Sequence, residues 1–300
     1  VDESGNVLER YSDVIEAIEA SDGNTVILLA DRSGELRLNN SYDFEVVIDL
    51  NGHSITAISY YGALLVENSD LNVIVKDSKG TGSITAVDGL RADQLVFNIG
   101  VLTFENVNIV SVEIRGVNNF AGTVNMYGGK ISVGNGPCIV NNGTLTIDGT
   151  VLITSSSFAI SNYGSADISN ATIISDHIAL DNSYECTMTL TNTIVSVDIY
   201  NYHADQHNVI NNLGTLTING GSVTVTVRNE GTINAIKSSD LLIVDEFHHI
   251  GAPVWGEKVN TLIYTHPDIK TFGMSAYSVR DRGTSYERDM TNPDTEEIFS

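Results

Sequence analysis

A short alternating segment recurs along this chain at a nearly constant interval. Residues 143–148 read Gly-Thr-Leu-Thr-Ile-Asp and residues 214–219 read Gly-Thr-Leu-Thr-Ile-Asn, and this alternation of polar and apolar residues predicts short strands. The first inward-facing apolar residues of successive segments are Leu102, Val124, Leu145, Ala166, Met188 and Leu216. Their positions differ by 22, 21, 21, 22 and 28. The predicted strand at 26–28 precedes the one at 47–50 by the same interval, since 47 − 26 = 21.

A period of this length that contains only strands restricts the fold to few architectures. Parallel strands joined by helices need a crossover of a dozen or more residues, and a propeller blade needs roughly 40–45 residues. A meander of hairpins needs tight two-residue turns, whereas each unit here holds two or three strands separated by corners with Asn and Gly, as between Asn142 and Ile160. The repeat therefore predicts a parallel β-solenoid in which each coil stacks on the previous one.

Asparagines recur at one corner of the predicted coils. Asn tolerates the left-handed backbone conformation, and stacked side-chain amides can form hydrogen bonds from coil to coil. The pattern therefore predicts a structural ladder along this corner. Its expected members are Asn119, Asn141, Asn162, Asn182, Asn212 and Asn229.

The two ends of the chain differ from the repeat. Residues 11–20 carry an apolar stripe with helical spacing, and the signals at Ser12 (N-cap) and Asp22-Gly23 (stop) predict a helix that covers the open end of the solenoid. Three of the four prolines lie beyond residue 251, where we expect an irregular cap or extension. The predicted organisation is a cap at 1–24, an all-β, right-handed parallel β-helix at 25–251, and an extension at 252–300. The extension packs on the last coil or joins a second copy in a homo-oligomer.

The charge balance excludes several classes of partner. Fifteen Lys and Arg against 38 Asp and Glu give 15 − 38 = −23, which repels phosphate and argues against nucleic acid and anionic membranes as partners. No apolar run reaches about 18 residues, so no membrane insertion is expected. The chain begins at Val1 without a basic leader, and we expect a mature or excised form. Cys138 and Cys186 lack metal-ligand spacing, and we expect buried thiols while a disulfide stays an alternative.

Three segments carry a resemblance to a known superfamily. Residues 49–55 (Asp-Leu-Asn-Gly-His-Ser-Ile), 143–147 (Gly-Thr-Leu-Thr-Ile) and 219–223 (Asn-Gly-Gly-Ser-Val) resemble the pectate-lyase-like right-handed parallel β-helix superfamily. The similarity covers roughly residues 12–245 and points to the adhesin-like branch, found in secreted bacterial cell-surface proteins and phage appendages. It implies an extracellular location, on a bacterial surface or a virion. It does not fix an activity, because many functions share this scaffold.

The enzymes of this superfamily are usually polysaccharide lyases or glycoside hydrolases. For a lyase, the resemblance implies an Arg-rich strand and clustered Asp residues that hold Ca²⁺, but Arg115 and Arg228 stand alone on their predicted coils. A hydrolase needs two carboxylates about 5–9.5 Å apart. The nearest candidates are Asp148 and Asp167, which would lie roughly 5 Å apart on adjacent coils if they were in register. Outward carboxylates on an acidic chain are more often solvated surface.

The long interval between Met188 and Leu216 predicts a protruding insertion, which in solenoids often forms the binding face. In an extended chain His203, Asp205 and His207 share one side and are candidate metal ligands. Tyr200 and Tyr202 also share a side and are a candidate stacking platform for a sugar ring. No fourth ligand is identifiable, so no metal or other cofactor is predicted. A polar, solvated loop is the simpler alternative.

Together these observations favour a non-catalytic function. We expect a rigid, acidic stalk or adhesin that contacts glycans or a partner surface. One alternative is a polysaccharide-degrading enzyme, a glycoside hydrolase or lyase with its site in a groove. The other is a purely structural phage or surface-layer component that binds only protein.

Overall fold

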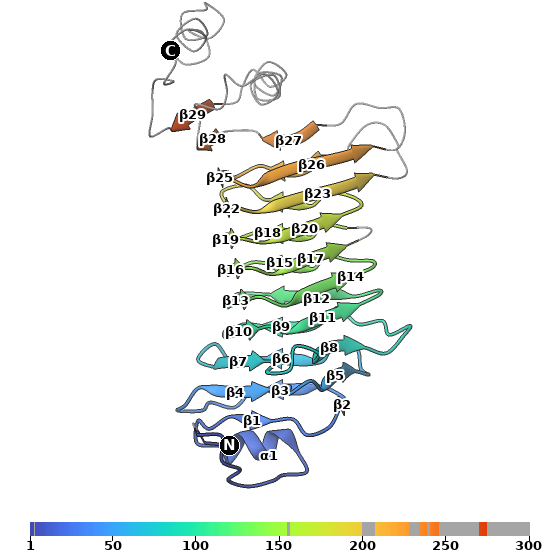
Figure 1. Ribbon diagram of the computed structural model, residues 1–300, viewed down its shortest axis with the longest axis vertical. Coiled ribbons are helices and arrows are strands. Elements are labelled where there is room, and N and C mark those ends of the chain that lie inside the picture. The colour runs from blue at the N-terminus through green and yellow to red at the C-terminus, as the bar shows by residue number, and fades with distance from the viewer. Residues whose placement is uncertain are drawn as a thin grey trace, which may run out of the picture.

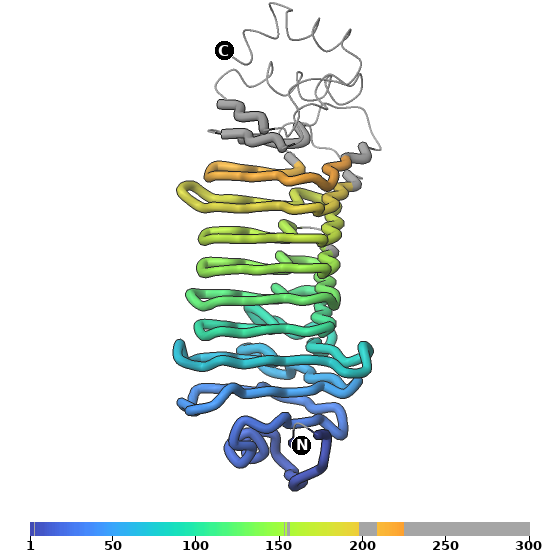
Figure 2. The backbone as a smooth tube through the Cα atoms, turned by 60° about the vertical axis from the view of Figure 1, so that its left-hand side comes forward, coloured from blue at the N-terminus to red at the C-terminus, as the bar shows by residue number. Residues whose placement is uncertain are grey.

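The chain folds into a right-handed parallel β-helix (Figure 1). The computed structural model describes residues 1–2, 4–154, 157–199 and 208–227, together with the strands at 234–238, 241–245 and 270–274. From β1 to β27 each coil contributes one strand to each of three sheets, and every described pair of neighbouring strands is parallel, as in β10 with β13 and β16. Successive coils stack along one axis from the N-terminal end to residue 227 (Figure 2).

The three sheets are named A, B and C in the order in which the chain visits them. Sheet A contains β1 (Val26–Ile27), β4 (Val46–Asp49), β7 (Asn72–Lys76), β10 (Val101–Glu105), β13 (Thr123–Tyr127), β16 (Thr144–Asp148), β19 (Ser165–Ser169), β22 (Thr187–Thr191), β25 (Thr215–Asn219), β28 (Leu241–Asp245) and β29 (Lys270–Met274). Sheet B contains β2 (Arg32–Ser33), β5 (Ser54–Ala57), β8 (Ser83–Ala86), β11 (Asn108–Ser111), β14 (Lys130–Val133), β17 (Val151–Thr154), β20 (Thr172–Ser175), β23 (Ile194–Ile199) and β26 (Ser222–Val227). Sheet C contains β3 (Leu36–Leu38), β6 (Leu64–Val66), β9 (Gln94–Asn98), β12 (Arg115–Asn119), β15 (Ile139–Asn141), β18 (Ile160–Asn162), β21 (Leu180–Asn182), β24 (Asn208–Asn212) and β27 (Asn234–Ser238).

The predicted repeat is confirmed in its register. The six inward-facing residues expected from the sequence pair with one another in turn across sheet A, from Leu102 to Leu216. The first interval is wrong by one position, because Val26 pairs with Ile48 and not with Val47. Val26 and Ile48 both face the core, whereas Val47 lies on the outer face of its strand, and a pairing of Val26 with Val47 would mix the two faces.

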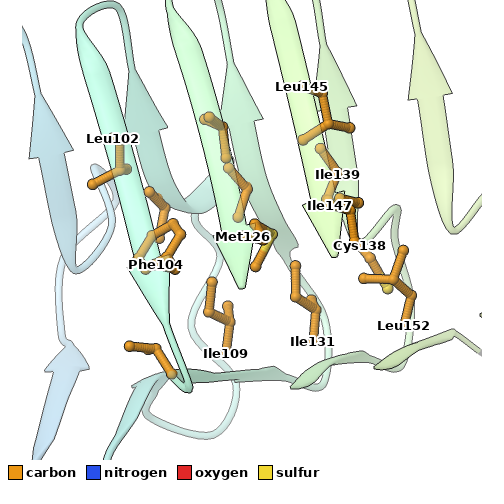
Figure 3. Packing of buried hydrophobic residues seen from close by; sticks show 14 of the residues in the cluster. Leu102, Phe104, Ile109, Met126, Ile131, Cys138, Ile139, Leu145, Ile147 and Leu152 are labelled. Atoms are coloured by element: carbon orange, nitrogen blue, oxygen red, sulfur yellow. The ribbon is translucent and has the colours of Figure 1, made fainter. Parts of the chain in front are cut away.

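The core is a column of aliphatic side chains enclosed by the three sheets. Leu145 and Ile147 of sheet A, Leu152 of sheet B and Ile139 of sheet C are all buried, and each comes from a coil that repeats the same arrangement (Figure 3). Burying a side chain of this size stabilises the fold by about 1.5–3 kcal/mol. Because each coil covers the apolar faces of its neighbours, the core continues along the solenoid.

The predicted asparagine ladder is confirmed at five positions, and it lies inside the solenoid. The amide Nδ2 of each member donates to Oδ1 of the next, at 2.7 to 2.9 Å, and every member is fully buried. In order the members are Asn98, Asn119, Asn141, Asn162, Asn182 and Asn212. The sequence pattern missed Asn98, and the predicted member Asn229 lies outside the described residues.

The ladder asparagines do not have the left-handed backbone conformation that was expected of them. That conformation occurs at the corner that follows sheet A. The non-glycine residues with positive φ include four asparagines outside the ladder, with φ of 49° to 58°. These residues are Asn51, Asn106, Asn170 and Asn192, and each follows a strand of sheet A. Gly128 and Gly149 occupy the same corner in other coils with φ of 71° and 73°. Asn and Gly share this corner because both tolerate this backbone region.

A short helix covers the N-terminal end of the solenoid (Figure 1). The helix α1 spans Val14–Glu19, and its N-cap is Asp13 rather than the predicted Ser12. The Asp13 carboxylate accepts hydrogen bonds from the backbone N–H groups of Ile15 and Glu16, at 2.7 and 3.3 Å. Asp13, and not Ser12, therefore satisfies the free N–H groups of the first turn. Ile18 is fully buried against the first coils. Within the described residues no helix has the length and apolar character needed to cross a bilayer.

One strand of sheet A lies in the segment predicted as a cap or extension. Strand β29 pairs in parallel with β28 and therefore extends sheet A into the segment predicted as a cap or extension. The remainder of that segment, and with it the proposed subunit contact, lies outside the described residues.

Candidate functional site

The predicted insertion falls between sheets B and C. Strand β23 ends at Ile199 and β24 begins at Asn208, so the extra residues of the long interval connect these two strands. The candidate ligand residues Tyr200, Tyr202, His203, Asp205 and His207 lie outside the described residues, and their roles stay predictions. In the part of the chain that is described, no three His, Cys, Asp or Glu side chains gather closely enough to hold a metal ion.

The two candidate carboxylates, Asp148 and Asp167, are not in register. Asp148 pairs with Ser169, and Asp167 pairs with Thr146. The aspartates are therefore diagonal neighbours, about 8 Å apart between Cα atoms for a strand spacing of about 4.8 Å and a rise of about 3.3 Å per residue. Both are exposed, and Asp148 accepts a hydrogen bond of 2.7 Å from the side chain of Asn170. The separation of roughly 5 Å between paired residues, expected from the sequence, is thus not met.

A cavity of about 460 Å³ lies elsewhere, at the N-terminal end. It is lined by residues between Val1 and Arg32, from the cap and the first strands. The aspartate pair lies several coils away, in β16 and β19. The cavity therefore gives these carboxylates no enclosed setting.

The two cysteines do not form a disulfide. Cys138 is buried in the core, as expected, whereas Cys186 is only half-buried at a corner before sheet A. Burial raises the pKa of the Cys186 thiol, and the neighbouring Glu185 carboxylate raises it further. A raised pKa keeps this thiol protonated and argues against a nucleophilic role.

A row of outward residues runs along the corner that follows sheet C, one per coil, directly after each ladder asparagine. We call it the corner row; its described members are Ile99, Phe120, Asn142, Tyr163, Ser183 and Leu213. Backbone N–H groups of the row donate to carbonyls of the preceding coil, from Phe120 to Asn98 at 2.9 Å and from Tyr163 to Asn141 at 2.7 Å. The buried ladder and the corner row, whose members are exposed except for the half-buried Ile99 and Ser183, are therefore the inner and outer sides of one hydrogen-bonded corner.

From Phe120 onward the corner row alternates apolar and polar side chains. Phe120, Tyr163 and Leu213 are 58%, 50% and 40% exposed, and Asn142 and Ser183 lie between them in the alternate coils. Coils are spaced about 4.8 Å apart, so Phe120 and Tyr163 are about 10 Å apart along the axis. Among the described residues, neither the Asn142 amide nor the Tyr163 hydroxyl has a hydrogen-bond partner, and both are open to an external ligand.

Phe97, on the outer face of sheet C, packs beside Phe120 and adds a second aromatic ring next to the corner row. Its ring centroid lies 5.9 Å from that of Phe120, with the ring planes inclined by 33°. Phe97 pairs in register with Asn118, whose side chain donates a hydrogen bond of 3.3 Å to Gln94. Two rings and two amides thus share one surface at this level of the solenoid.

A second group of aromatic residues lies further toward the N-terminus, on the loop that leads into β6. Tyr60 and Tyr61 are exposed and pack edge to face with ring centroids 6.0 Å apart. The guanidinium of Arg37 lies 5.2 Å from the Tyr61 ring centroid and forms an ion pair of 2.7 Å with Glu67. The Tyr60 hydroxyl donates to Asp93 at 2.9 Å, and this hydrogen bond raises the pKa of Tyr60. We call Tyr60, Tyr61 and Arg37 the tyrosine cluster.

Arg115 belongs to the same side of the molecule. It starts β12 and pairs in register with Gln94, whose side-chain amide reaches the carbonyl of Tyr61 at 3.4 Å. Within the described residues the Arg115 side chain has no ion-pair partner.

Sequence reasoning missed both aromatic groups, although one signal for the corner row was present. The residue after each ladder asparagine faces outward, because side chains alternate along a strand. Phe120 and Tyr163 could have been found by reading that position coil by coil. Among its described members the corner row carries no carboxylate, imidazole or thiol.

Comparison of the chain with protein-family models, with curated proteins and with solved structures found no match.

Proposed function

We propose that this protein is a non-catalytic β-helical rod that contacts glycans through one exposed face. The observation that carries the proposal is the corner row itself, in which the exposed rings of Phe120 and Tyr163 flank the exposed amide of Asn142 at positions fixed by the coil register. Pyranose rings present apolar C–H faces that pack on aromatic rings, and their hydroxyl groups form hydrogen bonds with amides and phenols. The corner row offers both kinds of group on one surface.

Rigidity supports the same proposal. The side chains of the corner row project from backbone that is hydrogen-bonded to neighbouring coils on the inside, through the ladder, and along the corner itself. A surface that is already ordered loses little conformational entropy when a ligand binds. Display on a bacterial cell surface or a phage particle is proposed from the resemblance of the sequence to adhesin-like β-helices.

Binding to immobilised neutral and acidic polysaccharides tests the proposal. We expect the full chain to be retained by at least one glycan, and Phe120→Ala and Tyr163→Ala to weaken this retention. Tyr127→Ala is the matched control, because Tyr127 is 44% exposed on sheet A, away from both aromatic groups. The proposal fails if no glycan retains the chain, or if the control weakens retention as much as the other variants do.

A further inference from the structure

We infer that the ligand of the corner row is a flat, uncharged glycan of the cellulose type that lies parallel to the solenoid axis. This inference rests on the proposed glycan-binding function and adds the orientation, the shape and the charge of the ligand. It concerns the segment from Phe120 to Leu213, five consecutive coils that the structure describes at this corner.

The repeat of the row determines the shape of the ligand. Apolar side chains occur in every second coil, at Phe120, Tyr163 and Leu213, and small polar side chains occur in the coils between them. In a cellulose-type chain neighbouring pyranose rings are flipped, so that every second ring presents the same face. Such a chain advances per ring by a length similar to the spacing of the coils, about 4.8 Å. The rings that stack would therefore be alternate rings of one chain.

The polar side chains of the corner row would lie beside the sugar rings that do not stack on an aromatic ring. The Asn142 side chain lies between Phe120 and Tyr163 and is exposed, and its amide has no partner among the described residues. An amide carries both donors and an acceptor and can bond two neighbouring hydroxyl groups of a sugar. A glycan that coils into a helix cannot keep alternate rings over Phe120 and Tyr163, because its rings turn away from a straight row.

The charges of the protein favour an uncharged glycan over an acidic one. All described members of the corner row are neutral, whereas the protein as a whole carries a formal charge of −23. The Arg37 guanidinium of the tyrosine cluster is held by Glu35 and Glu67, which leaves Arg115 as a single cation on the strands of sheet C from β3 to β24. A glycan with a carboxylate on each ring would meet repulsion along the rod without a line of cations to balance it.

Calorimetric titration of the full chain with cello-oligosaccharides, from the dimer to the hexamer, tests the inference. We expect the affinity to rise about tenfold once the oligomer is long enough to cover both Phe120 and Tyr163. Phe120→Ala or Tyr163→Ala removes this increment, and Asn142→Ala weakens hexamer binding about threefold to tenfold. Tyr127→Ala binds as the unmodified chain does, and melting curves establish that all variants are folded.

Two further ligands separate failure of the inference from failure of the proposed function. Malto-oligosaccharides of equal length, which coil, and carboxymethylcellulose, which is acidic, should both bind at least about tenfold more weakly. The inference is overturned, and glycan binding stands, if either binds as well as the cello-oligosaccharides or if length has no effect. The inference and the proposed glycan-binding function are both wrong if no glycan binds to the unmodified protein.

Discussion

At the scale of single residues, the ladder explains how a polar side chain can occupy the core at every coil. Asn141 accepts a hydrogen bond from Asn119 at 2.7 Å and donates to Asn162 at 2.8 Å, and it also donates to the carbonyl of Ser165 at 3.0 Å. A buried amide is costly only when its donors and acceptor lack partners. The ladder provides these partners within the protein and ties three coils together at one residue.

Removal of one ladder amide should therefore destabilise the fold. Asn141→Ala leaves the side-chain Nδ2 of Asn119 and the side-chain Oδ1 of Asn162 without their ladder partners. We expect the free energy of unfolding to fall by about 2–4 kcal/mol. Urea titration measures this change. The adjacent, exposed Asn142→Ala is the control and should change stability by less than about 0.5 kcal/mol. Equal midpoints for the two variants would contradict the structural role of the ladder.

Cys186 gives a residue-scale prediction about reactivity. Because burial and the Glu185 carboxylate both disfavour the thiolate, the pKa of this thiol is raised. Its rate of alkylation by iodoacetamide, followed by peptide mass spectrometry, should rise at a higher pH than that of an unfolded peptide with the same sequence. Glu185→Gln should move the profile to lower pH without reaching the peptide value, since burial is the larger cause. A profile of the folded protein at or below that of the peptide would be inconsistent with this environment.

At the scale of elements, the corners fix the solenoid as much as the strands do. Gly122, Gly143 and Gly164 occupy the same place in three successive coils, just before strands of sheet A. A Cβ added at Gly143 would overlap the carbonyl oxygen of Gly122, and one added at Gly164 would overlap that of Gly143. These glycines are needed because backbone approaches backbone there.

Two alanine substitutions distinguish close approach from backbone conformation. Gly143→Ala forces neighbouring coils apart, and we expect a loss of more than about 2 kcal/mol, the range of overpacked sites. A Cβ at Gly149 meets only the backbone nitrogen of Gly128, at 4.0 Å, but the residue has a φ of +73°. The cost of Gly149→Ala should therefore stay near about 1 kcal/mol, the penalty of the left-handed region. Thermal or urea unfolding of both proteins gives the comparison. Similar losses for the two would show that the coils have room to adjust.

The strands of this fold could be predicted from the sequence because each alternates polar and apolar residues, and the near-constant interval then gave the parallel stack. The same interval also fixes the register of single outward residues, whereas contacts made by loops of irregular length leave no periodic signal. In this part of the solenoid Asp148 is in register with Ser169, two positions beyond Asp167. The interval alone therefore excluded a direct pairing of the two aspartates. The tyrosine cluster had no such signal, because loops of irregular length bring Tyr61 beside Arg37.

At the scale of the whole molecule, the rod combines an uncharged corner row with a strongly acidic chain. A formal charge of −23 raises the free energy of the folded state through repulsion between like charges. The stacked coils hold these charges at fixed positions, whereas the unfolded chain can separate them. The same repulsion would oppose the approach of an acidic ligand.

Salt should therefore stabilise the folded protein. Raising sodium chloride from about 0.01 M to about 1 M shortens the Debye length from about 30 Å to about 3 Å. We expect the melting temperature to increase by at least about 2 °C, which for a chain of this size corresponds to roughly 1 kcal/mol. Differential scanning calorimetry measures the shift. An unchanged or lower melting temperature would show that repulsion contributes little.

In the proposed function, the rigid corner row binds a glycan without cleaving it. The most direct measurement incubates the chain with insoluble cellulose and determines, in the same sample over a long time course, the bound protein and the released reducing ends. We predict bound protein that is lost with Phe120→Ala and Tyr163→Ala, and no increase in reducing ends. A steady increase that Asp148→Asn or Asp167→Asn abolishes would contradict the account and identify an enzyme.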